Sequence, residues 1–159
     1  MAFTLSSPVF ADGQPLPPRY TQDGENLSPP LEWYDVPAQT RSFLLVLEDP
    51  DAPSGTFRHW GVYNLARDRG RLPEGVGHGV AQAGEPVEDI SAATNDYGHP
   101  RYDGPAPPHG DKAHRYVFRL AALDLEPLSR SLGLTVAEAM DAAQGHVIAE
   151  ARLTGTYRQ

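Results

Sequence analysis

The chain of 159 residues contains no cysteine, which excludes disulfides and thiol chemistry. Basic residues are also few, because 13 Lys and Arg stand against 21 Asp and Glu and give a formal charge of −8. The one local basic cluster is Arg67, Arg69 and Arg71. We therefore expect no nucleic-acid partner, and we regard binding to an anionic membrane surface as disfavoured, although a pocket for one lipid headgroup is compatible with this charge.

Long apolar runs are absent as well. No window approaches the length of a membrane span, and the first ten residues, MAFTLSSPVF, lack the basic and apolar regions of a secretory signal. The sequence thus predicts a cytoplasmic protein with no integral membrane association. Its length predicts a single domain over residues 1–159, with a substantial core.

Glycine and proline, by contrast, are abundant, at 15 and 16 residues. The prolines cluster at Pro15–Pro18, Pro29–Pro30, Pro50–Pro53 and Pro105–Pro108, and they are absent from the apolar runs. This pattern indicates strands joined by rigid loops rather than disorder.

A strand–turn–strand unit over Ser42–Leu65 is the strongest local signal. The apolar run Phe43–Leu47 suits a buried strand, because Pro50 and Pro53 follow it and prevent a helix from continuing. The next stretch, Phe57–Leu65, alternates. We expect one face to carry Phe57, His59, Gly61, Tyr63 and Leu65, and the other to carry Arg58, Trp60, Val62 and Asn64.

Weaker patterns complete the predicted fold. Further strands are expected at Phe3–Ser6, Leu31–Trp33, Val87–Ile90, His114–Leu123 and Arg152–Tyr157. A helix is expected to begin at Thr135, where Thr135 and Glu138 form a capping-box pattern, and to carry Val136, Met140, Ala143 and Val147 on one face, with Gly145 inside it. The fold class is therefore mainly β, a two-sheet antiparallel β-sandwich-like fold with a helix near the C-terminus.

Two carboxylates and two imidazoles fall at the ends of these strands, namely Asp49, Asp51, His59 and His114. They could form a polar pocket. Alternatively, the Asp residues could only stabilise the Pro-rich turn, and the histidines could be ordinary core residues. A metal site has weak support, because neither HxH nor HExxH occurs. No Ser lies in a GxSxG context, and nucleotide-binding glycine motifs are absent.

A long loop over Ser91–Lys112 precedes the strand that begins at His114. Its Gly- and Pro-rich part, residues 104–110, could be a disordered linker or a recognition segment for another domain. Its position beside a strong strand favours a structured pocket wall, where glycine lets backbone N–H groups approach an anion. The Tyr116 hydroxyl could contact the same anion, or Tyr116 could be a residue at the edge of the core.

Four sequence blocks together resemble the phosphatidylethanolamine-binding protein family, and more narrowly its bacterial Raf-kinase-inhibitor-like branch. The blocks are Tyr20–Trp33, Asp49–Pro53 with His59–Trp60, Tyr102–Gly110, and His114–Tyr116, and the tail from Gly145 to Tyr157 is also similar. The resemblance implies a two-sheet β fold with a small anion pocket, no cofactor, and a homodimer. The ligand-binding positions that it implies are Asp49, Asp51, Pro53, His59, Gly104, Pro105, Pro108, His114 and Tyr116.

The function expected from this resemblance is non-catalytic binding of a small phosphorylated or carboxylated anion. On this hypothesis Asp49 and Asp51 orient His59 and His114 and favour their protonated forms. A hydrolase that uses one His as general base is the first alternative, although no nucleophile is evident. A kinase or protease inhibitor that acts through its surface on a partner protein is the second.

Overall fold

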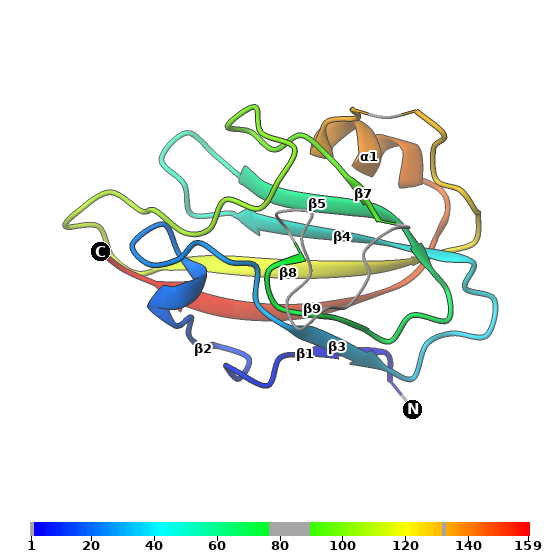
Figure 1. The fold of residues 1–159 in the computed structure, drawn as a ribbon, viewed down its shortest axis with the longest axis horizontal. Coiled ribbons are helices and arrows are strands. Elements are labelled where there is room, and N and C mark those ends of the chain that lie inside the picture. Colours follow the sequence, from blue (N-terminus) through cyan, green and yellow to red (C-terminus); the bar gives the residue numbers. More distant parts are fainter. Residues whose placement is uncertain (1, 77–89, 132) are drawn as a thin grey trace.

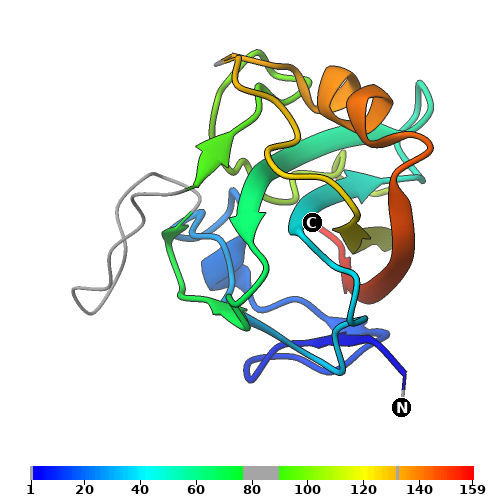
Figure 2. The same ribbon diagram turned by 90° about the vertical axis from the view of Figure 1, so that its right-hand side faces the viewer.

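The structure is a computed structural model that describes residues 2–76, 90–131 and 133–159. Within these residues the chain forms a six-stranded and a three-stranded sheet, and one α-helix near the C-terminus (Figure 1). The predicted fold class is confirmed. The view in Figure 2 shows the smaller sheet on one side of the larger sheet and the helix on the other.

The larger sheet has the strand order β2-β9-β8-β4-β5-β7. Its strands are β2 (Gln14–Pro15), β4 (Ser42–Asp49), β5 (Phe57–Ala66), β7 (Ser91–Ala92), β8 (His114–Leu123) and β9 (Val147–Tyr157). Neighbouring strands are antiparallel, except that β2 pairs with β9 in parallel. The predicted antiparallel arrangement therefore holds everywhere but at this short edge.

The smaller sheet has the order β1-β3-β6, with all pairs antiparallel. It consists of β1 (Thr4–Ser6), β3 (Leu31–Tyr34) and β6 (Arg71–Leu72), and a 3-10 helix, η1 (Pro18–Tyr20), follows β2. The predicted strands at Phe3–Ser6 and Leu31–Trp33 are thus confirmed. The predicted strand Val87–Ile90 lies outside the described residues, apart from Ile90.

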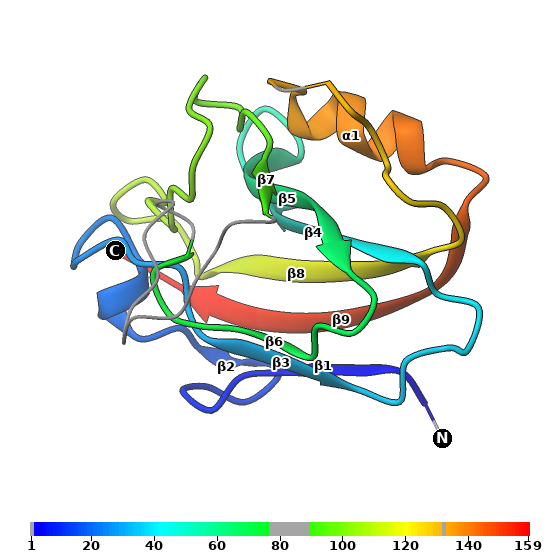
Figure 3. The ribbon, with the colours of Figure 1, turned by 45° about the vertical axis from the view of Figure 1, so that its right-hand side comes forward.

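The main core lies between the two sheets (Figure 3). Leu31 and Trp33 of the smaller sheet pack there against Phe43, Leu45 and other large side chains of the larger sheet. A second apolar cluster lies on the outer side of the larger sheet, where Leu44 and Val46 face the helix. The unbroken apolar run in β4 follows from this arrangement, because both faces of the strand are covered.

The helix α1 (Val136–Ala143) begins where the sequence predicted. The Thr135 hydroxyl accepts a hydrogen bond from the Glu138 backbone N–H at 3.1 Å, and the Glu138 carboxylate accepts one from the Thr135 N–H at 2.9 Å. The predicted extension of its apolar face to Val147 is wrong. Gly145 adopts a φ of +84°, and Val147 is already the first residue of β9.

Strand β5 departs from the strict alternation that the sequence predicted. Leu47 pairs with Trp60 and Glu48 pairs with Arg58, so that His59 is an extra residue in a β-bulge. As a result His59 does not share the face of Gly61, as was predicted. Its ring contacts the ring of Tyr116, on the side of the main core.

A second irregularity lies farther along β5. Phe43 pairs with Leu65 and Leu45 with Val62, and Asn64 has a φ of +59°. Because of this irregularity the Leu65 side chain packs in the main core, whereas the Tyr63 side chain packs on the helix side of the sheet. The predicted common face for Tyr63 and Leu65 is therefore wrong.

The site is positioned by the end of the larger sheet where the C-terminus lies. There β4 ends at Asp49, β5 begins at Phe57 and β8 begins at His114, and Asp49 and Phe57 are paired across β4 and β5 (Figure 1). Two loops, residues 50–56 and 93–113, surround these strand ends. Among the described residues, no helix is long and apolar enough to span a membrane.

Candidate anion-binding pocket

A pocket of about 200 Å³ lies between these strand ends and the two loops. It is lined by Asp49, Ala52, Pro53, Phe57, His59, Tyr97, Ala106, Pro107, Pro108, His114 and Tyr116. Strands β4, β5 and β8 supply the polar groups, and the loops supply the prolines and Tyr97. The pocket thus combines one carboxylate and two imidazoles with a largely aromatic and proline wall.

His114 lies between two carboxylates. Its Nδ1 is 2.7 Å from Asp49 Oδ2, and its Nε2 is 3.1 Å from Asp111 Oδ2. The side chains of His114 and Asp49 are each 5% exposed, whereas that of Asp111 is 42% exposed. Burial lowers the pKa of His114, but the hydrogen bonds to Asp49 and Asp111 outweigh it and leave the pKa above its ordinary value. The two carboxylates therefore favour the imidazolium form of His114.

Asp49 is itself held in place. Its Oδ1 accepts a hydrogen bond of 2.8 Å from the backbone N–H of Asp51, while its Oδ2 contacts His114. The carboxylate is thus shared between the turn after β4 and the first residue of β8. It fixes the orientation of the His114 ring.

His59 has different surroundings. Its Nδ1 is 2.8 Å from the carbonyl oxygen of Asp103, and its side chain is buried. Burial lowers the pKa of His59, and the hydrogen bond to the Asp103 carbonyl and the charges of Asp49 and Asp103 offset this only in part. The hypothesis that both histidines favour the protonated form is therefore supported for His114 but not for His59.

Aromatic rings pack edge-to-face along one wall of the pocket. The ring centres of Phe57 and Tyr97 are 4.6 Å apart, those of Phe57 and His59 are 5.0 Å apart, and those of His59 and Tyr116 are 5.5 Å apart. Burial and the neighbouring charge of Asp49 raise the pKa of Tyr116 well above its ordinary value. Tyr116 thus keeps its hydroxyl proton, and its O–H group can donate a hydrogen bond.

The structure brings six of the nine predicted site residues to the pocket, namely Asp49, Pro53, His59, Pro108, His114 and Tyr116. Asp51 points elsewhere, to Arg115. Its carboxylate accepts hydrogen bonds from Arg115 Nε at 3.0 Å, Nη2 at 2.9 Å and the backbone N–H at 2.8 Å. The hydrogen bond from Arg115 lowers the pKa of Asp51. Asp51 therefore anchors the turn after β4 to β8.

Gly104 and Pro105 were also predicted to bind the ligand, but they are not among the residues that line the pocket. The Gly104 N–H donates to Asn26 Oδ1 at 2.7 Å, and the Pro105 carbonyl accepts from the Gln22 N–H at 3.0 Å. A Cβ at position 104 would lie 2.3 Å from the carbonyl oxygen of Tyr20. These residues therefore join the loop after η1 to the pocket loop, and glycine is needed because the two backbones touch.

The sequence predicted no role in the site for Phe57 and Tyr97, which lie in the wall, or for Asp111, which lies beside His114. Phe57 was placed on a strand face but given no role in the site. Tyr97 and Asp111 lie in the long loop, where no periodicity indicates which side chains point inward. Only the nearness of Asp111 to His114, three residues apart in sequence, could have marked it.

A network around Asp103 fixes the shape of this loop. The Asp103 carboxylate accepts hydrogen bonds from Asn95 Nδ2 at 2.8 Å, His99 Nδ1 at 2.8 Å and Arg101 Nε at 3.2 Å. Burial alone would raise the pKa of Asp103, but these hydrogen bonds lower it. Because the Asp103 carbonyl contacts His59, the network also holds His59 in position.

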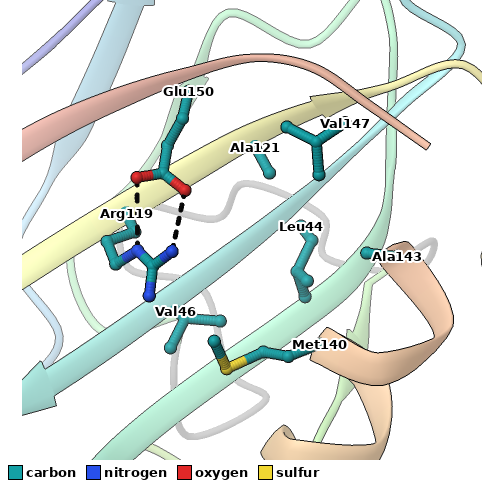
Figure 4. A pocket seen from close by; sticks show the side chains of 8 residues that line it. All are labelled: Leu44, Val46, Arg119, Ala121, Met140, Ala143, Val147 and Glu150. Carbon is teal, nitrogen blue, oxygen red and sulfur yellow. Dashed lines mark hydrogen bonds and ion pairs between the residues drawn. The ribbon is translucent and has the colours of Figure 1, made fainter. Parts of the chain in front are cut away.

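A second hollow, of about 80 Å³, lies under α1 on the other face of the larger sheet (Figure 4). Leu44, Val46 and Met140 form its apolar walls, and the Arg119 guanidinium at its edge is paired with Glu150. None of the predicted site residues lines this hollow, whereas six of them line the pocket around His114, which is therefore the candidate site. Within the described residues no three His, Asp or Glu side chains converge as metal ligands.

Known proteins that are similar to this chain indicate its family. Residues 6–158 match the family model for phosphatidylethanolamine-binding protein. A UPF0098 protein of Methanothermobacter thermautotrophicus is 42% identical over 98% of both chains, and the UPF0098 protein YbhB of Escherichia coli is 40% identical over 96% of this chain and 98% of its own.

Two crystal structures are similar over 99% of this chain and 98% of their own. The phosphatidylethanolamine-binding protein homologue CT736 of Chlamydia trachomatis is 37% identical, with a TM-score of 0.86. YbcL of Escherichia coli, described as a member of the mammalian family, is 30% identical, with a TM-score of 0.90. The chain therefore belongs to the phosphatidylethanolamine-binding protein family, as the sequence blocks predicted.

Proposed function

We propose that the chain is a non-catalytic binding protein for a small phosphorylated or carboxylated anion of the phospholipid-headgroup type. The observation that carries the proposal is the buried His114, which lies between two carboxylates and lines a pocket at the end of the larger sheet. An imidazolium N–H is a strong donor to an anionic oxygen, and an aromatic and proline wall excludes water that would weaken this bond.

Family membership supports the same class of ligand. The matching family model and the relative CT736 carry the name of a phospholipid with a phosphate headgroup. Tyr116 adds a hydroxyl that stays protonated, and Asp49 keeps the His114 ring in one orientation. A phosphate or carboxylate oxygen at His114 Nε2 would replace the exposed Asp111 carboxylate.

Hydrolysis is a weaker candidate. The described residues that line the pocket include no Ser, Thr, Cys or Lys, and two groups that could act as nucleophiles, the Asp49 carboxylate and the His114 ring, are hydrogen-bonded to each other. His59 could act as a base on a water molecule. Regulation of a partner protein is compatible with binding of an anion, and it stays a prediction from the family resemblance.

The test is calorimetric titration of the full chain with inorganic phosphate and with phosphorylethanolamine. We expect saturable binding, and we expect His114→Ala to weaken it by about 10-fold or more, because a hydrogen bond to a charged group is worth about 1.5–3 kcal/mol. His146→Ala is the matched control, since His146 is half-exposed and pairs with Asp124 outside the pocket. Equal affinity in His114→Ala and the natural chain would overturn the proposal, and turnover of a phosphate ester would favour the hydrolase.

A further inference from the structure

The pocket offers an unequal set of donors and acceptors. Its main donor is the Nε2–H of His114, because Asp49 already occupies Nδ1. Two groups beside this donor are acceptors, the Asp111 carboxylate and the ring of His59. An anion without a hydrogen atom has nothing to donate to either of them.

The tautomer of His59 follows from its partner. The Asp103 carbonyl oxygen, 2.8 Å from Nδ1, can only accept a hydrogen bond, so Nδ1 carries the hydrogen. In the neutral ring Nε2 is then a bare acceptor. His59 is 3% exposed, and burial lowers its pKa despite the facing charges of Asp49 and Asp103, so the ring stays neutral. Because Nδ1 is engaged behind the wall, Nε2 is the nitrogen available to a ligand in the pocket.

Asp111 adds a second acceptor with more freedom to move. It follows Gly110, whose φ is +85°, in a turn closed by a hydrogen bond of 3.2 Å from its N–H to the Pro108 carbonyl. Its carboxylate is 42% exposed, so it can turn into water when a ligand oxygen takes its place at His114. Even then its negative charge remains close to the ligand and disfavours an anion that has no proton.

We propose that the pocket selects an anion that still carries a proton, so that phosphate and phosphate monoesters are bound in their protonated forms and sulfate is rejected. One phosphate oxygen accepts from His114 Nε2–H, and the phosphate O–H donates to His59 Nε2. His59 and Asp111 are thus the specificity-determining residues. The inference rests on the proposed anion-binding function and names its ligand class.

Phosphate and sulfate have the same shape, which makes them a matched pair of probes. At pH 7 inorganic phosphate keeps at least one proton and sulfate keeps none. Calorimetric titration of the full chain at constant ionic strength should show phosphate bound about 100-fold more tightly than sulfate, since a site built to bind a hydroxyl rejects the analogue that lacks it.

Two variants test the assignment of residues. In His59→Asn the amide N–H can still reach the Asp103 carbonyl, while the Nε2 acceptor is lost. The preference for phosphate over sulfate should therefore fall by about 10-fold, because phosphate binds more weakly. In Asp111→Asn a charge is lost and an amide donor gained, so sulfate binding should strengthen by about 10-fold. Asp141→Asn, the same change at an exposed position of α1, should alter neither affinity.

The outcomes are distinct. Equal affinity of the natural chain for phosphate and sulfate would overturn the inference and leave the proposed function standing. No binding of either anion would overturn both. A preference that persists unchanged in a folded His59→Asn and in Asp111→Asn would also overturn the inference. Asp111→Asn keeps the test available if His59→Asn does not fold, because Asp111 is exposed in a loop.

Discussion

At the scale of residues, His59 and His114 line one pocket but are given opposite protonation preferences by their partners. His114 contacts two carboxylates, which raise its pKa against the effect of burial, whereas His59 contacts a carbonyl and its pKa is lowered by burial. We expect the two pKa values to lie on opposite sides of about 6.5, the ordinary value for histidine. Titration of the ring ¹⁵N signals by NMR measures both.

These pKa shifts also carry a sign for stability. The raised pKa of His114 stabilises the folded state below the ordinary pKa of histidine, and this contribution is lost as the pH rises through the raised value. The lowered pKa of His59 has the opposite effect on stability. Its stabilising contribution is present above the ordinary pKa of histidine and is lost as the pH falls through the lowered pKa. Titration of both rings on the same side of 6.5 would contradict this account of the pocket.

At the scale of elements, the close contact between two loops at Gly104 gives a stability prediction. In Gly104→Ala the new Cβ would lie 2.3 Å from the Tyr20 carbonyl oxygen, so the pocket loop must shift. We expect a loss of about 1–3 kcal/mol in the free energy of unfolding, together with weaker phosphate binding, since overpacking displaces backbone. Urea denaturation and calorimetry measure the two effects.

Gly70→Ala provides the control for this prediction. A Cβ at position 70 would have its nearest neighbour, the Trp33 carbonyl oxygen, at 4.0 Å, which is an ordinary contact. We therefore expect a change within about 0.5 kcal/mol, as for other surface substitutions. If Gly104→Ala were as mild as Gly70→Ala, the close approach of the loops would not be the reason for glycine.

Much of this element-level description was accessible from the sequence, because apolar runs and capping residues are local signals. Strands β4 and β8 and the start of α1 follow from such patterns. The two irregularities of β5 do not follow from local patterns. A bulge depends on the register between β5 and β4, and the alternation of polar and apolar residues in the sequence does not reveal it. For the same reason His59 was assigned to the wrong face although its presence in the pocket was predicted.

The site shows the same division. Asp49, His114 and Tyr116 occupy strand ends, and their positions follow from the strands. Side chains from loops could not be oriented in this way. Asp51 binds Arg115 outside the pocket, and Asp111 contacts His114 although no role in the site was predicted for it. Contacts that form only after folding decide these orientations.

At the scale of the whole molecule, the homodimer implied by the family resemblance stays a prediction. Light scattering coupled to size-exclusion chromatography would measure the mass of the purified chain, and we expect about twice the monomer mass of 17.3 kDa. A mass of one chain across the accessible concentration range would refute the dimer. The cytoplasmic location stays a prediction as well.

The central claim is that a small anion binds to this protein at His114. The most direct measurement follows the ¹⁵N signal of His114 Nε2 by NMR during titration with inorganic phosphate, with the signal of the exposed His146 as internal reference. The account predicts a saturable shift at His114 with the same dissociation constant as calorimetry, and no shift at His146 beyond the effect of ionic strength. Saturable binding that leaves the His114 signal unchanged, or a complete absence of binding, would contradict it.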